Sequence, residues 1–245
     1  MIIKNLPSTN CNERRNDQAP SMIILHYTGT RSAQEAEEIY LTPDKVAPHY
    51  MVDGTGNITQ YVDEKKRAWH AGISSWGRMD DINSASIGIE IWNTGHEYDL
   101  EEFPDVQIIA VIDLVRDIRD RNDIPDYHIL GHSDVAPGRK IDPGEKFPWD
   151  KLATAGLGLM PQVTHEDELL AAHWMDQPEL ILSALKEYGY DPSVDVNILL
   201  REFRRHFLPT TLDDWGADMA TCSALAALTR QKRKLKFDRD HRSVA

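Results

Sequence analysis

The chain has 245 residues and a formal net charge of −13, with 41% hydrophobic and 27% charged residues. This composition suits one globular domain with a smaller second one and excludes a disordered chain. The acidic excess argues against a general nucleic-acid-binding protein, which needs a basic surface. The segment from Arg230 to Arg242 is the exception at net +5, and we interpret it as a solvated terminus or a weak anchor for an anionic surface.

Cysteine usage and hydropathy bear on the compartment. Cys11 and Cys222 are far apart and indicate neither a disulfide framework nor a thiolate zinc site. Residues 1–20 lack the apolar core of a secretory signal, and no apolar run is long enough to predict a membrane span. We therefore expect a cytoplasmic protein, with the periplasm or cell envelope as the alternative.

The first predicted elements alternate between strands and helices. The apolar run MIILHY (22–27) predicts a buried strand, and the Ser–x–x–Glu pattern that starts at Ser32 predicts the beginning of a short helix. Residues 49–62 predict a hairpin around the turn sequence DGTGN. SIGIEIWN (86–93) predicts another strand, whose isoleucines share one face while Gly88 and Glu90 share the other.

A long helix and one more strand complete the first domain. Residues 104–121 predict an amphipathic helix with an apolar residue at every third position, namely Ile109, Ile112, Val115 and Ile118. YHILGH (127–132) predicts a strand that ends at His132. The fold class is therefore α/β, with a mixed central sheet flanked by helices.

The remainder of the chain has a helical pattern only. Residues 152–167 are rich in glycine and proline and are interpreted as a linker. Helices are expected at about 166–188, 195–207 and 216–231. The sequence thus predicts a small three-helix domain after the α/β domain.

Two histidines and an aspartate lie at or after strand ends. His26 is the second-last residue of the predicted strand 22–27, and His132 is the last residue of the predicted strand 127–132. Asp142 lies in the loop GHSDVAPGRKIDPG (131–144). Two imidazoles and one carboxylate leave the fourth tetrahedral position open, as catalytic zinc requires. The three form no contiguous zinc motif, so the alternative is that both histidines are ordinary hydrogen-bonded residues.

Two further charged residues suit hydrolysis beside such a metal. Glu90 stands within an isoleucine-rich strand, where a carboxylate costs free energy unless it is paired or functional, and it can carry a proton from water to a leaving amine. Lys140 lies two residues before Asp142 and can stabilise an oxyanion. The alternatives are a salt bridge across the sheet for Glu90 and an ordinary surface position for Lys140.

The segment RAWHAGISSW (67–76) places Trp69, His70 and Trp76 around a glycine. Aromatic faces next to polar edges are typical of surfaces that bind sugar rings or peptides. The alternative is an aromatic patch that closes the core.

Taken in chain order, these segments resemble the zinc-dependent N-acetylmuramoyl-L-alanine amidases of type 2, relatives of the peptidoglycan recognition proteins. The resemblance covers about residues 1–155 and rests on five segments in the same order: ILHYTGT (24–30), APHYMVDGTGNITQYV (47–62), AWHAGISSW (68–76), NSASIGIEIWN (83–93) and GHSDVAPGRKIDPG (131–144). More loosely, LKEYGYDP (185–192) and REFRRHF (201–207) resemble the peptidoglycan-binding-like domain appended to some of these amidases.

The resemblance implies a domain organisation and a set of site residues. A catalytic domain would span residues 1–158, a helical peptidoglycan-binding-like domain 165–235, and a basic tail 236–245. One zinc ion would be bound, Glu90 and Lys140 would be catalytic, and His49 would have a supporting role. The implied metal ligands are His26, His132 and Asp142, and the implied substrate contacts are Trp69, His70, Ala71 and Asn83. Pro48 stands where some members have a tyrosine, which indicates the subgroup that uses the glutamate.

The implied activity is hydrolysis of the amide between N-acetylmuramic acid, or its 1,6-anhydro form, and L-alanine of the stem peptide. Such an enzyme acts in bacterial peptidoglycan turnover or recycling, with muropeptides or larger peptidoglycan fragments as partners. A non-catalytic peptidoglycan-binding module is the main alternative, and a zinc peptidase of other specificity is a third. Because all three metal positions are filled, the sequence favours the enzyme.

Overall fold

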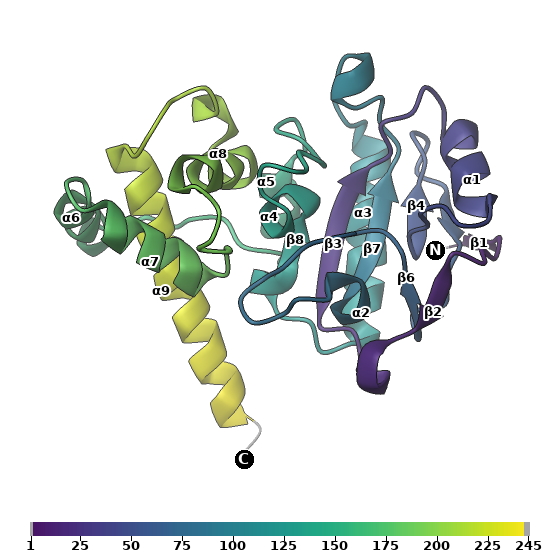
Figure 1. The fold of residues 1–245 in the computed structure, drawn as a ribbon, viewed down its shortest axis with the longest axis horizontal. Coiled ribbons are helices and arrows are strands. Elements are labelled where there is room, and N and C mark those ends of the chain that lie inside the picture. The colour runs from purple at the N-terminus through teal and green to yellow at the C-terminus, as the bar shows by residue number, and fades with distance from the viewer. Residues whose placement is uncertain (1, 243–245) are drawn as a thin grey trace.

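A mixed six-stranded sheet forms the centre of the first part of the chain in the computed structural model, which describes residues 2–242 (Figure 1). The strand order is β1-β5-β4-β7-β3-β8, and only β4 and β5 are antiparallel neighbours. The strands are β1 (Ile3–Asn5), β3 (Met22–Tyr27), β4 (Tyr50–Val52), β5 (Ile58–Gln60), β7 (Ser86–Ile91) and β8 (Ile129–Gly131). A separate antiparallel pair joins β2 (Cys11–Glu13) to β6 (Lys66–Ala68). The expected mixed sheet is confirmed.

Helices cover both faces of this sheet, and the part of the chain that follows α5 is mainly helical. In the described residues the α-helices are α1 (Ala33–Leu41), α2 (Ile82–Ala85), α3 (Asp105–Arg121), α4 (His132–Val135), α5 (Trp149–Thr154), α6 (His165–Trp174), α7 (Pro178–Tyr188), α8 (Val196–Phe207) and α9 (Met219–Arg242). Short 3₁₀ helices lie at Arg15–Asp17, His96–Tyr98, Asp126–His128 and Pro209–Thr211.

Several local predictions are confirmed. β3 has the limits of the predicted run 22–27, and β4 and β5 form the hairpin expected within 49–62. Ser32 caps α1, since its side chain accepts a hydrogen bond from the Glu35 backbone N–H at 3.1 Å. The strand expected at 127–132 is shorter, because Tyr127 and His128 belong to a 3₁₀ turn that precedes β8.

One face of the sheet is buried against α3, through only part of the apolar series that the sequence suggested: Ile112, Val115 and Ile118 pack there and Ile109 does not. Ile109 is 59% exposed, and the side chains that pack on the sheet include Ile108, Val111, Val115 and Ile118. A three-residue step falls about 60° short of a full helical turn. A strict i+3 series therefore drifts around the helix, and the buried face follows the mixed steps of three and four residues.

The opposite face of the sheet carries the polar residues of interest. Ile23 and Leu25 of β3 face α3, so the alternation of the strand turns Met22, Ile24 and His26 to the other side. His26 is paired in register with Glu90 of β7, which places both side chains on this face. The helices α1 and α4 and the loop that leads from β6 to α2 lie over it (Figure 1).

The helical part differs from the sequence expectation in three places. The single helix expected at 166–188 is two helices, α6 and α7, because Pro178 has no N–H to continue α6 and instead starts α7. The module therefore has four helices where three were expected. The linker is shorter than 152–167, since α5 continues to Thr154 and α6 begins at His165. The last helix begins at Met219 and continues to Arg242, far beyond the expected end at 231.

The helical module α6–α9 is joined to the α/β part by buried polar contacts. The Asp134 carboxylate of α4 accepts hydrogen bonds from Tyr190 Oη at 2.6 Å and from His206 Nδ1 of α8 at 2.7 Å. Asp134 is 0% exposed. Arg205 of α8 also forms an ion pair with Glu145. Because these donors and acceptors are removed from water, each depends on its partner in the other part for a hydrogen bond.

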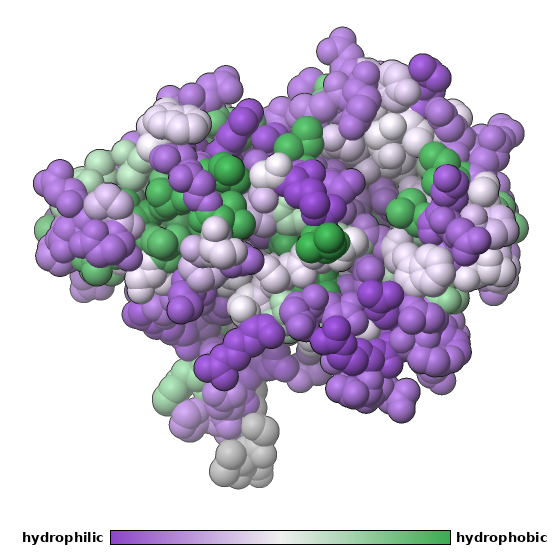
Figure 2. All heavy atoms as spheres, viewed as in Figure 1, coloured by the Kyte–Doolittle hydropathy of each residue, from purple (hydrophilic) through white to green (hydrophobic). Residues whose placement is uncertain are grey.

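The basic segment continues the last helix. Arg230 forms an ion pair with Asp167 and Arg233 forms one with Glu187, so part of this segment is held against the module. Of the tail expected at 236–245, residues 243–245 lie outside the described residues. Hydrophilic residues cover most of the face shown in Figure 2, and hydrophobic ones gather over the helical module. Among the described helices, none is long and apolar enough to cross a membrane.

Candidate active site

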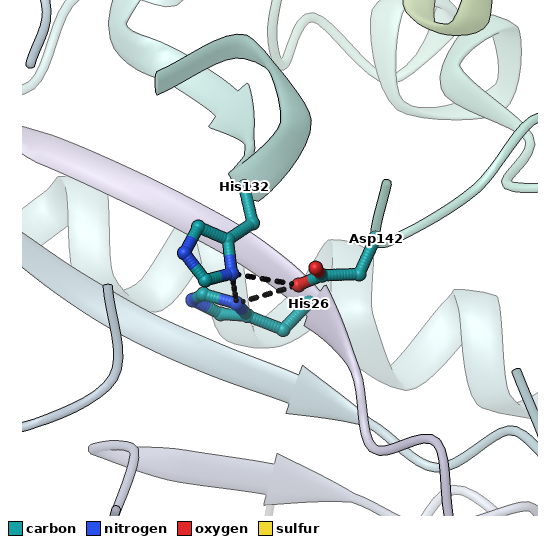
Figure 3. Close-up of side chains that lie close together, drawn as sticks. All are labelled: His26, His132 and Asp142. Carbon is teal, nitrogen blue, oxygen red and sulfur yellow. Dashed lines mark hydrogen bonds and ion pairs between the residues drawn. The ribbon is translucent and has the colours of Figure 1, made fainter. Parts of the chain in front are cut away.

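Three side chains from separate segments converge on one point above the sheet (Figure 3). His26 lies near the end of β3, His132 begins α4, and Asp142 lies in the loop that follows α4. The Nδ1 atoms of His26 and His132 are 3.0 Å apart, and Asp142 Oδ2 lies 2.8 Å from the former and 3.0 Å from the latter. The structure therefore brings together the three residues that the sequence marked as metal ligands.

The donor set fits a zinc ion. A tetrahedral zinc with ligands about 2.0–2.1 Å away holds its donor atoms about 3.3 Å apart, slightly wider than the separations seen here. Burial, the first cause, and the neighbouring His132 lower the pKa of His26 to about 4, so its imidazole is neutral, the form that binds metal. Burial alone would raise the pKa of Asp142, but the two imidazoles hold it well below its usual range.

Hydrogen bonding fixes the orientation of His132. Its Nε2 lies 2.9 Å from the Ala71 carbonyl oxygen. A carbonyl only accepts, so Nε2 carries the proton and Nδ1 presents its lone pair to His26 and Asp142. Metal-binding histidines commonly donate their second N–H to such a partner. The geometry thus suits a metal ligand better than an ordinary core histidine.

Glu90 lies on the sheet beside His26, at the floor of a groove. Burial, followed by the negative charge of Asp142, raises the pKa of Glu90 well above its usual range, while Lys140 opposes the rise. Its Oε2 is buried and has no hydrogen-bond partner among the described residues. The raised pKa therefore lets the carboxyl group bind a proton. Among the described residues Glu90 forms no salt bridge, so the alternative of a salt bridge across the sheet is not observed.

The groove has a volume of about 460 Å³ and contains the three converging residues, Glu90 and Lys140. Sequence reasoning missed other side chains in its wall. Arg139 donates to the carbonyl oxygens of Ala71, at 2.7 Å, and Ile73, and its only sequence signal was its position next to Lys140. Tyr98 stacks under the Arg31 guanidinium at 4.5 Å, and no local pattern indicated that it would reach the groove.

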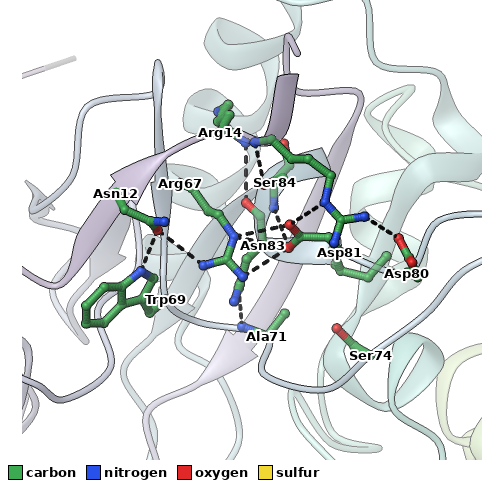
Figure 4. A network of polar contacts seen from close by, with 12 residues as sticks. Asn12, Arg14, Arg67, Trp69, Ala71, Ser74, Asp80, Asp81, Asn83 and Ser84 are labelled. Carbon is green, nitrogen blue, oxygen red and sulfur yellow. Dashed lines mark hydrogen bonds and ion pairs between the residues drawn. The ribbon is translucent and has the colours of Figure 1, made fainter. Parts of the chain in front are cut away.

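The residues expected to contact substrate do not all line this groove. Figure 4 shows Trp69, Ala71 and Asn83 within a network of polar contacts near the β2–β6 pair. Asn83 is 5% exposed, and its Oδ1 accepts from the backbone N–H groups of His70 and Ala71 at 3.1 and 2.8 Å. Trp69 lies near the β2–β6 pair and donates from Nε1 to Asn12 at 2.8 Å. Of the four, only His70 lines the groove. In this structure Asn83 holds the loop that carries His70 and Ala71.

His49 has the supporting position that was expected. It is 0% exposed, its Nδ1 accepts from the Gly88 backbone N–H at 3.0 Å, and its Nε2 donates to the Lys66 carbonyl oxygen at 3.1 Å. Burial, together with the nearby Arg14, lowers the pKa of His49 to about 3. The neutral ring therefore ties β7 to the strand that leads into the loop carrying His70.

A second hollow of about 700 Å³ lies beside β1 and α3. Both of its arginines that these contacts involve are held by Glu64: Arg121 donates to Glu64 Oε1 at 2.6 Å, and Arg14 donates to the Glu64 carbonyl oxygen at 2.9 Å. Although this hollow is larger, the converging imidazoles and the uncommonly basic carboxylate lie in the groove. We therefore assign the site to the groove.

Comparison with known sequences identifies relatives over most of the chain. A sequence profile of N-acetylmuramoyl-L-alanine amidases matches residues 16–145. The N-acetylmuramoyl-L-alanine amidase AmiD of Escherichia coli is 34% identical over 227 residues, which cover 84% of this chain and 81% of the relative. The 1,6-anhydro-N-acetylmuramyl-L-alanine amidase AmpD of Haemophilus influenzae is 30% identical over 169 residues, covering 60% of this chain and 89% of its own length.

Solved structures agree with this result across both parts of the molecule. AmpDh3 of Pseudomonas aeruginosa is 31% identical with a TM-score of 0.77, over 87% of this chain and 92% of its own. AmiD of Escherichia coli in complex with anhydro-N-acetylmuramic acid-L-Ala-D-γ-Glu-L-Lys is 30% identical with a TM-score of 0.75, over 87% of this chain and 90% of its own. Sequence, fold and site together show that this chain belongs to the N-acetylmuramoyl-L-alanine amidase family.

Proposed function

We propose that this protein hydrolyses the amide between N-acetylmuramic acid, in its 1,6-anhydro or ordinary form, and L-alanine of the stem peptide, with one zinc ion held by His26, His132 and Asp142. The observation that carries the proposal is the convergence of three neutral or anionic ligand atoms within 3.0 Å of one another, in a groove that also contains Glu90. A bound zinc ion would supply a Lewis acid and lower the pKa of a water molecule.

Two residues of this chain carry the proposed proton transfer and charge stabilisation, Glu90 and Lys140. Glu90, whose pKa is raised by burial and by Asp142, accepts a proton from the attacking water and delivers it to the leaving amine of L-alanine. Lys140 lies on the groove wall, and its positive charge affects both Glu90 and His26. It stabilises the oxyanion that forms on the carbonyl oxygen of the lactyl group when water adds to the carbonyl carbon.

Known relatives guide the choice of substrate. AmpDh3 has been solved in complex with an anhydromuramic pentapeptide, and AmiD with an anhydro-muramyl tripeptide. We propose that the groove of this protein accepts anhydro-muropeptides of the same chemistry. Direct contact of Trp69, His70, Ala71 and Asn83 with the glycan or peptide remains a prediction.

The helical module is proposed to act as a structural partner of the catalytic part. Its expected limits were 165–235, and its last helix continues to Arg242. The buried hydrogen bonds from Tyr190 and His206 to Asp134 support this role. Binding of glycan by the module is the further role that the resemblance implies, and sedimentation with polymeric peptidoglycan would test it. The expected cytoplasmic location, with the envelope as the alternative, is testable by cell fractionation.

The decisive experiment is incubation of the zinc-loaded protein with an anhydro-muropeptide and, separately, with polymeric peptidoglycan. We expect new N-terminal L-alanine, detected by end-group labelling and mass spectrometry, and a comparison of the two rates gives the preferred substrate. Glu90→Gln should lower kcat by about 10²–10⁴ while zinc content is unchanged. Binding without release would indicate the non-catalytic module, and a different new N-terminus would indicate a peptidase of other specificity.

A further inference from the structure

A buried series of hydrogen bonds leads from His26 to a backbone carbonyl. His26 Nε2 lies 3.0 Å from His70 Nδ1, His70 Nε2 lies 3.2 Å from Ser86 Oγ, and Ser86 Oγ lies 2.6 Å from the Ile82 carbonyl oxygen. The four residues are between 0% and 7% exposed. The series therefore runs from the metal position, beside the groove, to the first residue of α2 through buried side chains.

The chemistry of the last member fixes the direction of every bond. A carbonyl oxygen only accepts, so the Ser86 hydroxyl donates its proton to Ile82. Ser86 Oγ then accepts from His70 Nε2. A neutral imidazole carries one N–H, and in His70 the contact with Ser86 places that N–H on Nε2. His70 Nδ1 is therefore an acceptor, and His26 Nε2 must donate to it.

We propose that His70 is a positioning residue which, through Ser86 and the Ile82 carbonyl, fixes His26 in the tautomer whose Nδ1 lone pair faces His132 and Asp142. The inference rests on the proposed metal-binding role of His26. It adds the support of a metal ligand to the substrate contact that was expected of His70. Partners of this kind set the orientation and basicity of metal-binding imidazoles.

The surrounding fold is shaped to hold the His70 ring in this place. A Cβ atom at Gly88 would lie 2.4 Å from His70 Cγ, so only glycine at this position of β7 leaves room for the imidazole. The loop that carries the ring is held by Asn83, whose Oδ1 accepts from the His70 backbone N–H at 3.1 Å. The His70 ring thus lies over Gly88, on the face of β7 that Gly88 shares with Glu90.

The test is the zinc dissociation constant of the full chain, measured by competition with a chromogenic chelator. His70→Phe keeps the ring volume but removes the acceptor, and it should weaken zinc binding about 10–100-fold. His70→Asn, whose Oδ1 can accept from His26, should recover most of the loss, and Ser86→Ala should show a smaller loss than His70→Phe. His128→Asn is the matched control, because His128 binds the Ser21 carbonyl oxygen at the opposite end of the strands. The zinc affinity of this variant should equal that of the wild-type protein.

A second readout does not depend on any variant. Long-range ¹H–¹⁵N spectra of the wild-type protein should show His26 and His70 both protonated at Nε2. Protonation of His70 at Nδ1, or wild-type zinc affinity in a folded His70→Phe variant, would overturn the inference. If His70→Phe does not fold, the wild-type spectrum and the zinc affinity of Ser86→Ala test the inference instead. Because neither readout uses substrate, failure to release L-alanine-terminated peptide would refute the proposed function and leave this inference standing.

Discussion

Replacement of Asp134 by alanine should disrupt the joint between the catalytic part and the helical module. The carboxylate accepts from the Gly131 backbone N–H at 2.8 Å, from Tyr190 Oη at 2.6 Å and from His206 Nδ1 at 2.7 Å. Tyr190 is 1% exposed and His206 is 3% exposed. Alanine would therefore leave two side-chain donors and one backbone donor buried without an acceptor.

The expected cost follows from this geometry. Each buried donor left unpaired costs about 1–3 kcal/mol, and removal of one member of a buried charged set costs about 3–5 kcal/mol in total. We expect the free energy of unfolding to fall by about 3–5 kcal/mol, a large share of the roughly 5–15 kcal/mol that stabilises a typical domain. For a chain of this size the melting temperature should fall by about 6–20 °C.

The assay is urea denaturation, followed by tryptophan fluorescence and by far-ultraviolet circular dichroism. Tyr190→Phe should cost less than Asp134→Ala, and the double variant should cost less than the sum, because both changes remove the same hydrogen bond. Asp120→Ala on the exposed face of α3 is the control and should change stability by less than about 0.5 kcal/mol. A loss below about 1 kcal/mol for Asp134→Ala, or separate unfolding of the two parts in wild type, would refute the reasoning.

Three further predictions concern the site and the pH dependence of stability. Lys140→Ala should lower kcat for L-alanine release by about 10²–10³ with zinc affinity unchanged, and an unaltered kcat would remove Lys140 from the mechanism. Dialysis against a chelator should abolish release and added zinc should restore it; activity that survives metal removal would contradict the assigned ligands. Burial lowers the pKa of Lys232 to about 8, against about 10.4 in the unfolded chain. The unfolded chain binds more protons between these values, so stability should rise with pH from about 8 to 10.4, and urea midpoints for Lys232→Met should lack that rise.

Local structure was predictable where neighbouring residues decide it. Five apolar or aromatic residues and one histidine set the limits of β3. Five turn residues between β-rich arms set the β4–β5 hairpin. The order of the motifs also predicted which residues would form the site, and the structure brings His26, His132 and Asp142 together. The break at Pro178 was missed when a single helix was expected at 166–188, although proline cannot continue a helix.

Other features depend on contacts between residues far apart in the chain, and only the tertiary structure decided them. The buried face of α3 is the one that meets the sheet, and α9 reaches Arg242 although its last turns carry no apolar pattern. The contact of His70 with His26 was not expected, and it depends on the space above Gly88 and on the hydroxyl of Ser86. The sequence alone determined the chemical groups and the strands that carry them. Which of these groups support one another depended on how the sheet, the loop and the helical module pack, because hydrogen-bond direction and burial exist only between assembled elements.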